Sequence, residues 1–334
     1  MQIGSVLAGI LIISLGIQFA IGASGETELP SAGRVLTLEQ AVQTAIANNP
    51  ELEIGRQSVE VAKGRILAAE AFPNPEVEIE GSPSIPKGEY NFSAGVDQTV
   101  PILGKISKRI AVAKEELARA EWELHDTERR LIAEVKRTFR NAQVVGERIG
   151  LANSLASLNQ RLFEIAKARF NKGEVSELDV HQFEIELKQR QQEVKVLLSE
   201  RTSALLELSR LLNIPYKEDL MLSSEIAIEL ELPPLTSLLN VAQNRPDIKA
   251  AQAEVSAIEK GHKLILAERW DDPKVGFFFS REKSVFDEPI ELSDIDSFAG
   301  VRITVPLPLF YRKEGELVQS LAGIKSAEAR VLAE

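Results

Sequence analysis

The chain contains no cysteine among its 334 residues. Without cysteine there is no disulfide framework, no zinc site built on thiolates and no lipid-anchoring cysteine near the start. The compartment in which the protein works must therefore be inferred from other features.

Aromatic residues are scarce as well, with 13 Phe, three Tyr and two Trp. That is a small supply for one compact core in a chain of this length. Acidic residues outnumber basic ones by 50 to 39, and the formal net charge of −11 argues against nucleic acid as the main partner.

The first 25 residues lack Lys and Arg and carry an apolar run from Ile3 to about Ala23. Ala20 and Gly22 are small at the two positions that matter for cleavage, which predicts a signal peptide over 1–22. The run is also long enough to span a bilayer, so an uncleaved anchor is the alternative. In both cases the rest of the chain leaves the cytoplasm.

One phrase occurs twice, as AGVDQTVP at 94–101 and as AGVRITVP at 299–306. The order of elements around it repeats too, because 36–80 parallels 235–279 and Pro50 and Pro75 match Pro246 and Pro273. A period near 200 residues is far too long for a solenoid. The sequence therefore predicts a duplicated domain, with units at 36–212 and 235–334 joined by a linker at 213–234.

Each unit begins with helical sequence followed by a strand pair. In the first unit we expect a helix over 38–72 and strands over 76–82 and 90–100, where apolar and polar residues alternate. A long helix over 103–170 follows, with a turn at 171–176 and a returning helix over 177–212. A helix of this length has no place in a compact globular domain.

Eleven of the aromatic residues gather in the two strand pairs and their helix junctions, at 72–92 and 270–311. In membrane β-barrels such residues form girdles at the lipid boundary. Four strands cannot close a barrel, but three copies would supply twelve. The alternative is a soluble coiled-coil protein that carries two hairpins.

Six stretches in this order resemble the TolC family of outer-membrane efflux proteins, within it the CzcC-like cation-efflux branch. They are LTLEQAVQTAIANNPEL, FPNPEVEIE, DQTVPILGK, ARFNKGEVSELDV, RPDIKAAQAEV and TVPLPLFYRKEGE. The resemblance implies an α+β membrane protein in which a duplicated helix, β-hairpin and long-helix unit forms part of a trimeric 12-stranded outer-membrane β-barrel and a periplasmic α-helical barrel.

The resemblance also implies a function and partners. The protein would be the passive outer-membrane channel of a tripartite efflux system, as a homotrimer with a periplasmic adaptor and an inner-membrane RND-type pump, and would pass heavy-metal cations without a cofactor. Drugs or other small molecules are alternative cargoes, because a fold does not name the cargo. A non-conducting periplasmic coiled-coil scaffold or tether is the alternative of a different class.

Three groups of site residues are carried over from the family. The adaptor-docking tip would contain Arg169, Phe170, Gly173, Leu178 and Asp179, although Gly173 and Leu178 also suit a turn that only closes the helix pair. An acidic strand facing the lumen would contain Glu76, Glu78 and Glu80, and a merely solvated strand face is the alternative. Pro101 and Pro306 would mark the swivel from barrel to tube.

The second unit departs from the family pattern, because its helix after Pro306 stops at Glu334. The second tip and its returning helix are missing, so we expect a fragment or a truncated product.

Catalytic signals are poor. His125, His181 and His262 lie on helical sequence without a metal-ligand pattern, and exposed helix residues explain them better. No P-loop and no Gly-x-Ser-x-Gly motif is present, so the sequence predicts neither an enzyme nor a resident metal.

Overall fold

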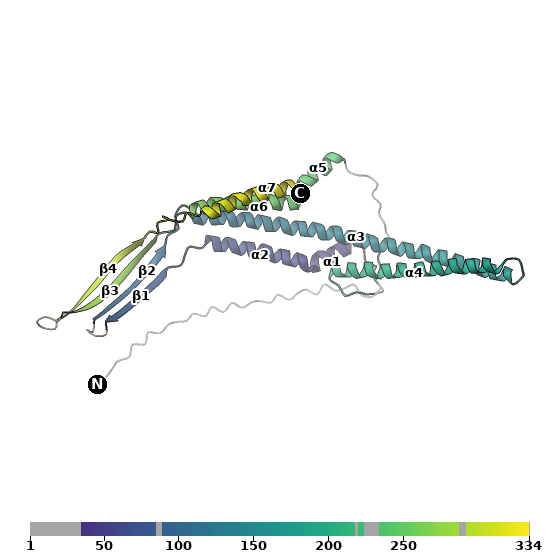
Figure 1. Cartoon of the computed structure of the whole chain (residues 1–334), viewed down its shortest axis with the longest axis horizontal. Helices are drawn as coiled ribbons and strands as arrows, with labels where there is room; N and C mark the ends of the chain where they lie inside the picture. The colour runs from purple at the N-terminus through teal and green to yellow at the C-terminus, as the bar shows by residue number, and fades with distance from the viewer. Residues whose placement is uncertain (1–34, 85–88, 218–219, 224–233, 287–291, 334) are drawn as a thin grey trace, which may run out of the picture.

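The computed structural model describes residues 35–84, 89–217, 220–223, 234–286 and 292–333. The expected signal peptide at 1–22 lies outside these residues, as does most of the expected linker at 213–234. The molecule is a long rod with a small sheet at one end and a helical hairpin at the other (Figure 1).

The chain enters the rod through two short helices, α1 (Leu38–Asn48) and α2 (Pro50–Glu70). The expected single helix over 38–72 is thus wrong. Pro50 has no N–H to donate and holds the residue before it in extended conformation, which is why Asn49 has φ −69° and ψ 125°. Asn49 then caps α2 by accepting from Glu51 N at 2.8 Å, and its Nδ2 donates to Leu211 O at 3.1 Å.

The rod itself is α3 (Lys105–Phe170), whose 66 residues extend roughly 100 Å at 1.5 Å per residue. Helix α4 (Glu177–Leu212) returns along it after a turn at 171–176, where Gly173 has φ +77°. A capping box between Ser176 and Asp179 starts α4, and Asn213 ends it in the left-handed conformation. These bounds agree with the helices expected at 103–170 and 177–212.

The main apolar core lies where α1, α2, α3 and α4 meet, about midway along the rod. It contains Phe139 and Val135 on α3 and Leu208 and Leu212 on α4, all four with no exposed surface. Leu36 adds to this core and forms a parallel bridge with Leu222. The core therefore anchors the start of the first unit to its returning helix.

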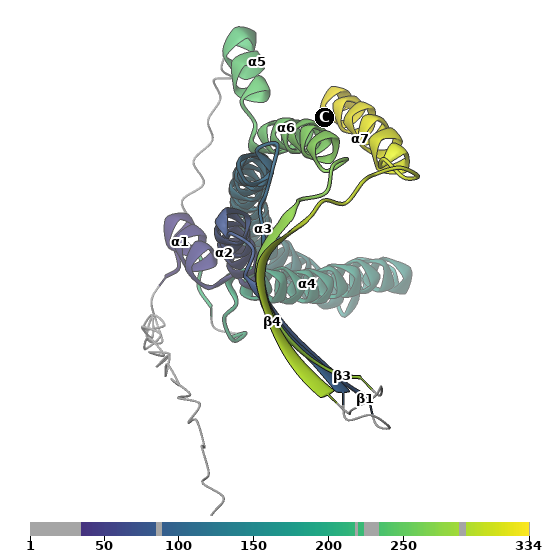
Figure 2. The same cartoon turned by 90° about the vertical axis from the view of Figure 1, so that its left-hand side faces the viewer.

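The second unit packs on the same long helix through α6 (Pro246–Ala267). Its helices are α5 (Leu235–Gln243), α6 and α7 (Glu314–Ala333), with α6 packed on α3 and α7 packed on α6. Small residues face inward on α6, where Ala250, Ala251 and Ala253 are buried. Such residues let two helices approach closely, so the second unit continues the helical layer (Figure 2).

All four strands form one antiparallel sheet in the order β1-β2-β3-β4. They are β1 (Glu76–Ser84), β2 (Glu89–Thr99), β3 (Lys274–Phe286) and β4 (Leu292–Thr304). The β2–β3 pairing joins the two units, while β1 and β4 are the outer strands. The sheet is strongly curved (Figure 2), and within the described chain each outer strand has one unpaired edge.

Candidate functional site

The sheet has one polar and one apolar face, because directly opposed residues of antiparallel strands share a face. Row by row, Glu76 opposes Asp97, Asp97 opposes Gly276, and Gly276 opposes Arg302. We call this side the polar face; its members with polar side chains include Glu76, Glu78, Glu80, Ser82, Glu89, Asn91, Ser93, Asp97, Lys274, Ser280, Glu282, Asp294, Asp296 and Arg302.

The apolar face lies on the other side. Phe277 is 70% exposed there, and Val77 and Ile79 are each 69% exposed. The apolar members of this face include Val77, Ile79, Tyr90, Phe92, Ala94, Val96, Val275, Phe277, Phe279, Val285, Ile295, Ala299, Val301 and Ile303. An exposed apolar surface on this scale needs a covering partner or a membrane.

The end of the polar face that lies near the helices carries a network of ion pairs. Lys274 Nζ lies 2.6 Å from Glu76 Oε2. Arg302 donates to Glu78 Oε2, and its Nη1 lies 3.7 Å from Asp97 Oδ2. Glu76 and Glu78, two of the three acids expected to face a lumen, are therefore neutralised. Glu80, the third, makes no hydrogen bond or ion pair with the described residues.

The Phe278 side chain lies on the polar face beside these ion pairs, although its chain neighbours Phe277 and Phe279 belong to the apolar face. The Arg302 guanidinium carbon lies 5.4 Å from the centre of the Phe278 ring, a cation–π contact. A side chain at Gly300 would place its Cβ 2.8 Å from Phe278 Cε1, and one at Gly95 would lie 3.4 Å from Phe278 Cβ. The phrase that the sequence repeats thus sets a glycine on each side of Phe278, in the row Gly95–Phe278–Gly300.

Farther from the helices, the polar face changes character. Glu89, Glu282, Asp294 and Asp296 lie there together with Glu80, and none of the described residues on that part of the face is a cation. A hollow of about 180 Å³ separates the two zones. It is lined by Glu80, Ser82, Asn91, Ser93, Phe278, Ser280 and Arg302. Sequence reasoning missed these four acids, although the alternation in LSDIDSF places Asp294 and Asp296 on one face.

A buried lysine fixes the junction between sheet and helices. Lys105, only 3% exposed, donates to Asp272 Oδ1 at 2.7 Å and to Trp270 O at 2.5 Å. The same carboxylate oxygen accepts from Ile102 N at 3.0 Å. Pro101 follows the end of β2 directly before this clasp, and Pro306 holds the same place after β4. The clasp joins the two units where the strands give way to helices.

The helical tip at the opposite end contains the five residues expected to dock an adaptor. Arg169 and Phe170 end α3, and Arg169 Nε lies 3.4 Å from Glu174 Oε2. Leu178 is 77% exposed, so it does not close the helix pair. Asp179 accepts from Ser176 Oγ at 2.7 Å and from Ser176 N at 3.0 Å, and these bonds lower the pKa of the Asp179 carboxyl.

Residues 41–213 match the family model described as outer membrane efflux protein. The chain belongs to the outer membrane efflux protein family. It is 25% identical over 340 residues to the cobalt-zinc-cadmium resistance protein CzcC of Cupriavidus metallidurans, covering 97% of this chain and 77% of CzcC. The protein is therefore an efflux channel component of the outer membrane and periplasm.

Solved channels share its fold. The Campylobacter jejuni CmeC outer membrane channel superposes with a TM-score of 0.68 at 15% identity, covering 89% of this chain and 67% of CmeC. The open state of the Neisseria gonorrhoeae MtrE outer membrane channel gives 0.64 at 17% identity, covering 89% of this chain and 70% of MtrE. The long helices and the sheet of this efflux protein thus have the fold of part of one chain of such a channel.

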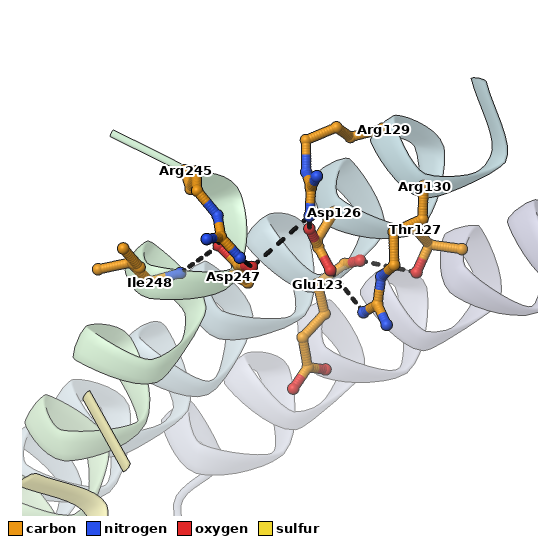
Figure 3. A network of polar contacts seen from close by, with 8 residues as sticks. All are labelled: Glu123, Asp126, Thr127, Arg129, Arg130, Arg245, Asp247 and Ile248. Atoms are coloured by element: carbon orange, nitrogen blue, oxygen red, sulfur yellow. Dashed lines mark hydrogen bonds and ion pairs between the residues drawn. The ribbon is translucent and has the colours of Figure 1, made fainter. Parts of the chain in front are cut away.

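The second unit of the efflux protein is fastened to α3 by a charged cluster (Figure 3). Buried Asp126 accepts from Arg129 Nη2 at 2.6 Å, and the same nitrogen lies 3.6 Å from Asp247 Oδ2 on α6. Burial raises the pKa of Asp247, but the Arg245 and Ile248 hydrogen bonds and the charges of Arg245 and Arg129 outweigh it, so that the pKa is lowered. The cluster fixes the position of α6 along the axis of α3.

The histidines do not form a site. His125 lies 5.7 Å from the Trp122 ring, and His181 lies 3.5 Å from Glu184. His262 departs from the expectation of an exposed residue, since it is half-buried and its Nδ1 lies 2.7 Å from Ser320 Oγ. In the described part of the chain, no group of three or more His, Asp or Glu is arranged to hold a metal.

Among the residues that the structure describes, no helix combines the length and the apolar character needed to cross a membrane.

Proposed function

We propose that this chain is the outer-membrane duct of a three-part efflux system and that it passes heavy-metal cations. The observation that carries the proposal is the acidic end of the polar face, formed by Glu80, Glu89, Glu282, Asp294 and Asp296. Carboxylate rings favour cations in a pore, and unpaired carboxylates act more strongly than paired ones. The CzcC relative, named for cobalt, zinc and cadmium resistance, supports the same cargo.

The duct is a homotrimer. The unpaired edges of β1 and β4 would meet between copies, so that three four-stranded sheets close into a barrel of about twelve strands without edges. The polar face would line the lumen, and the apolar face would lie against lipid. Repeated three times, the acidic end becomes a ring at the mouth farther from the helices.

The tip of α3 and α4 is the docking site for a periplasmic adaptor, which links the duct to an inner-membrane pump. The side chains of Leu178 and Phe170 support this role, because both are exposed at the end of a rod about 100 Å long. Pro101 and Pro306, which follow β2 and β4, would act as the swivel between barrel and tube.

Ion selectivity tests the proposal. The full chain is purified in detergent, inserted into planar bilayers, and its reversal potential is measured in a KCl gradient. We expect a preference for cations that weakens in Glu282→Gln/Asp294→Asn/Asp296→Asn. The matched control Glu39→Gln/Glu51→Gln/Glu328→Gln removes the same charge from exposed helix positions and should leave the preference unchanged. No conductance, or a preference for anions, would contradict the proposal.

Zinc passage tests the cargo. Proteoliposomes that contain the chain and an entrapped zinc indicator should admit Zn²⁺ faster than a neutral solute of similar size enters. The triple acid variant should reduce this advantage, and the control variant should keep it. Equal entry rates for the two solutes would limit the conclusion to a non-selective duct and would overturn the assignment of metal cations.

A further inference from the structure

Two cations lie on the apolar face of the sheet, which also carries the polar residues Gln98 and Ser297. Arg281 and Lys283 occupy alternate positions of β3, on the same side as Phe277 and Phe279. Arg281 opposes Phe92, while Lys283 opposes Tyr90. Both therefore project from a surface made mainly of aromatic and branched apolar side chains.

Among the residues that the structure describes, no carboxylate pairs with either cation. Within the described chain, Arg281 and Lys283 form no hydrogen bond or ion pair, whereas Lys274 and Arg302 on the polar face are both paired with glutamates. An unpaired charge on an apolar surface suits an anion supplied from outside the chain.

Their position along the strand is specific. Arg281 lies six residues beyond Val275, about 20 Å along β3, and Lys283 lies about 7 Å farther on. The helices belong to the periplasm, so this end of the sheet points away from the periplasm (Figure 1). Tyr90 beside Lys283 fits the boundary between hydrocarbon and headgroups, where amphipathic rings gather.

A second copy of the chain would not cover these residues. β3 is an inner strand whose two edges are already paired with β2 and β4. Pairing between copies would use the free edges of β1 and β4 and would leave the apolar face of β3 uncovered. In an outer membrane protein, the material against this face is lipid.

We propose that Arg281 and Lys283 bind the phosphate of an anionic lipid headgroup in the outer leaflet, with the acyl chains lying on Phe277, Phe279 and Phe92. The inference rests on the proposed function, because it takes the apolar face as the lipid side of the barrel. Arg supplies a planar fork of donors for phosphate oxygens and Lys supplies a point charge at a spacing of about 7 Å. The site would hold the lipid through its phosphate and would fix how deeply the barrel sits in the membrane.

Native mass spectrometry of the detergent-purified full chain tests the site. The probe is lipid A, compared with its fully dephosphorylated form and with phosphatidylcholine. The wild type should retain the phosphorylated probe preferentially. Arg281→Gln/Lys283→Gln should reduce this retention by about 30-fold, from roughly 1 kcal/mol for each basic residue near a charged membrane surface. An excess of inorganic phosphate should not displace the lipid.

Two further variants make the result decisive. Arg281→Lys/Lys283→Arg keeps both charges and should keep the retention, while Lys263→Gln/Lys325→Gln removes two exposed helix charges and should leave it unchanged. A wild type that holds phosphorylated and dephosphorylated lipid equally, or a loss of the same size in the helix control, would overturn the inference. Conductance of the same wild-type sample separates the two proposals, because a conducting channel without phosphate preference refutes only the lipid site.

Discussion

Single residues explain why the chain repeats one phrase. Gly95 and Gly300 oppose Phe278 from either side, and the ring lies over the place where Gly300 would carry a side chain. The ring in turn supports Arg302, which neutralises Glu78. The repeated glycines therefore make room for one aromatic ring that only the second unit contributes.

At this scale, Gly300→Ala should destabilise the sheet. The new Cβ would lie 2.8 Å from Phe278 Cε1, so the ring must shift, and its contact with Arg302 must shift with it. We expect a loss of about 1 kcal/mol or more in unfolding free energy, as for other overpacked sites. Denaturant unfolding of the purified chain measures it.

The matched control is Gly81→Ala, where nothing lies within 4 Å of the added Cβ and the loss of flexibility should be neutral or slightly stabilising. Phe278→Ala combined with Gly300→Ala should cancel most of the clash. Equal effects of Gly300→Ala and Gly81→Ala would show that the Phe278 ring does not depend on this glycine.

Helices and strands were predicted from the sequence better than the contacts between side chains. The absence of proline between Leu103 and Phe170 and the 3–4 spacing of apolar residues sufficed for α3, and alternation sufficed for the two faces of β2. The break at Asn49 was missed because an apolar pattern continues across Pro50, although the proline itself forbids a continuous helix.

The chemistry of the polar face could not be predicted in the same way. Arg302 meets Glu78 across 224 residues, and this pairing depends on the register of all four strands and the curvature of the sheet. The alternation in EVEIE placed three glutamates on one face but gave no information about the cations opposite. The same holds for Lys105 and Asp272, which are 167 residues apart.

At the helical tip, Ser176→Ala should loosen the first turn of α4. Ser176 Oγ accepts from Asp179 N, so the variant removes this half of a capping box, while the backbone N–H of residue 176 can still donate to Asp179. Such a cap is worth about 1 kcal/mol. Hydrogen exchange over 177–182 should therefore become faster by roughly fivefold, as an opening free energy lowered by that amount implies.

Ser154→Ala is the matched control, because Ser154 lies inside α3 and its Oγ donates to Gly150 O of its own helix. Its variant should leave exchange at the tip unchanged.

The lowered pKa of Asp179 adds a dependence on pH: the cap is complete above the ordinary aspartate pKa and is lost as the pH falls through the lowered value. Unchanged exchange in Ser176→Ala would show that the cap does not hold the turn.

The whole molecule is asymmetric in a way that favours assembly. Its helices pack on one another through α3, but the sheet has an uncovered apolar face and two free edges within the described chain. Free strand edges pair readily with other strands. In a ring of copies joined edge to edge, the backbone groups at the free edges of β1 and β4 are all paired. The chain has no native cysteine, so introduced cysteines can test this arrangement without competing cross-links.

The assembly test places one cysteine on each edge. Ile303→Cys on β4 is combined in turn with a cysteine at Val77, Ile79, Gly81 or Pro83 on β1. All four lie on the same face as Ile303, because a slip of one residue would turn a side chain to the other face. Oxidation of the purified chain should yield a covalent trimer on a non-reducing gel for one of these pairs, the one that the register between copies brings within disulfide distance. The single variants should at most form dimers. Absence of a covalent trimer in all four pairs would contradict closure of the barrel through β1 and β4, whereas a trimer would fix their register and with it the position of the acidic ring in the lumen.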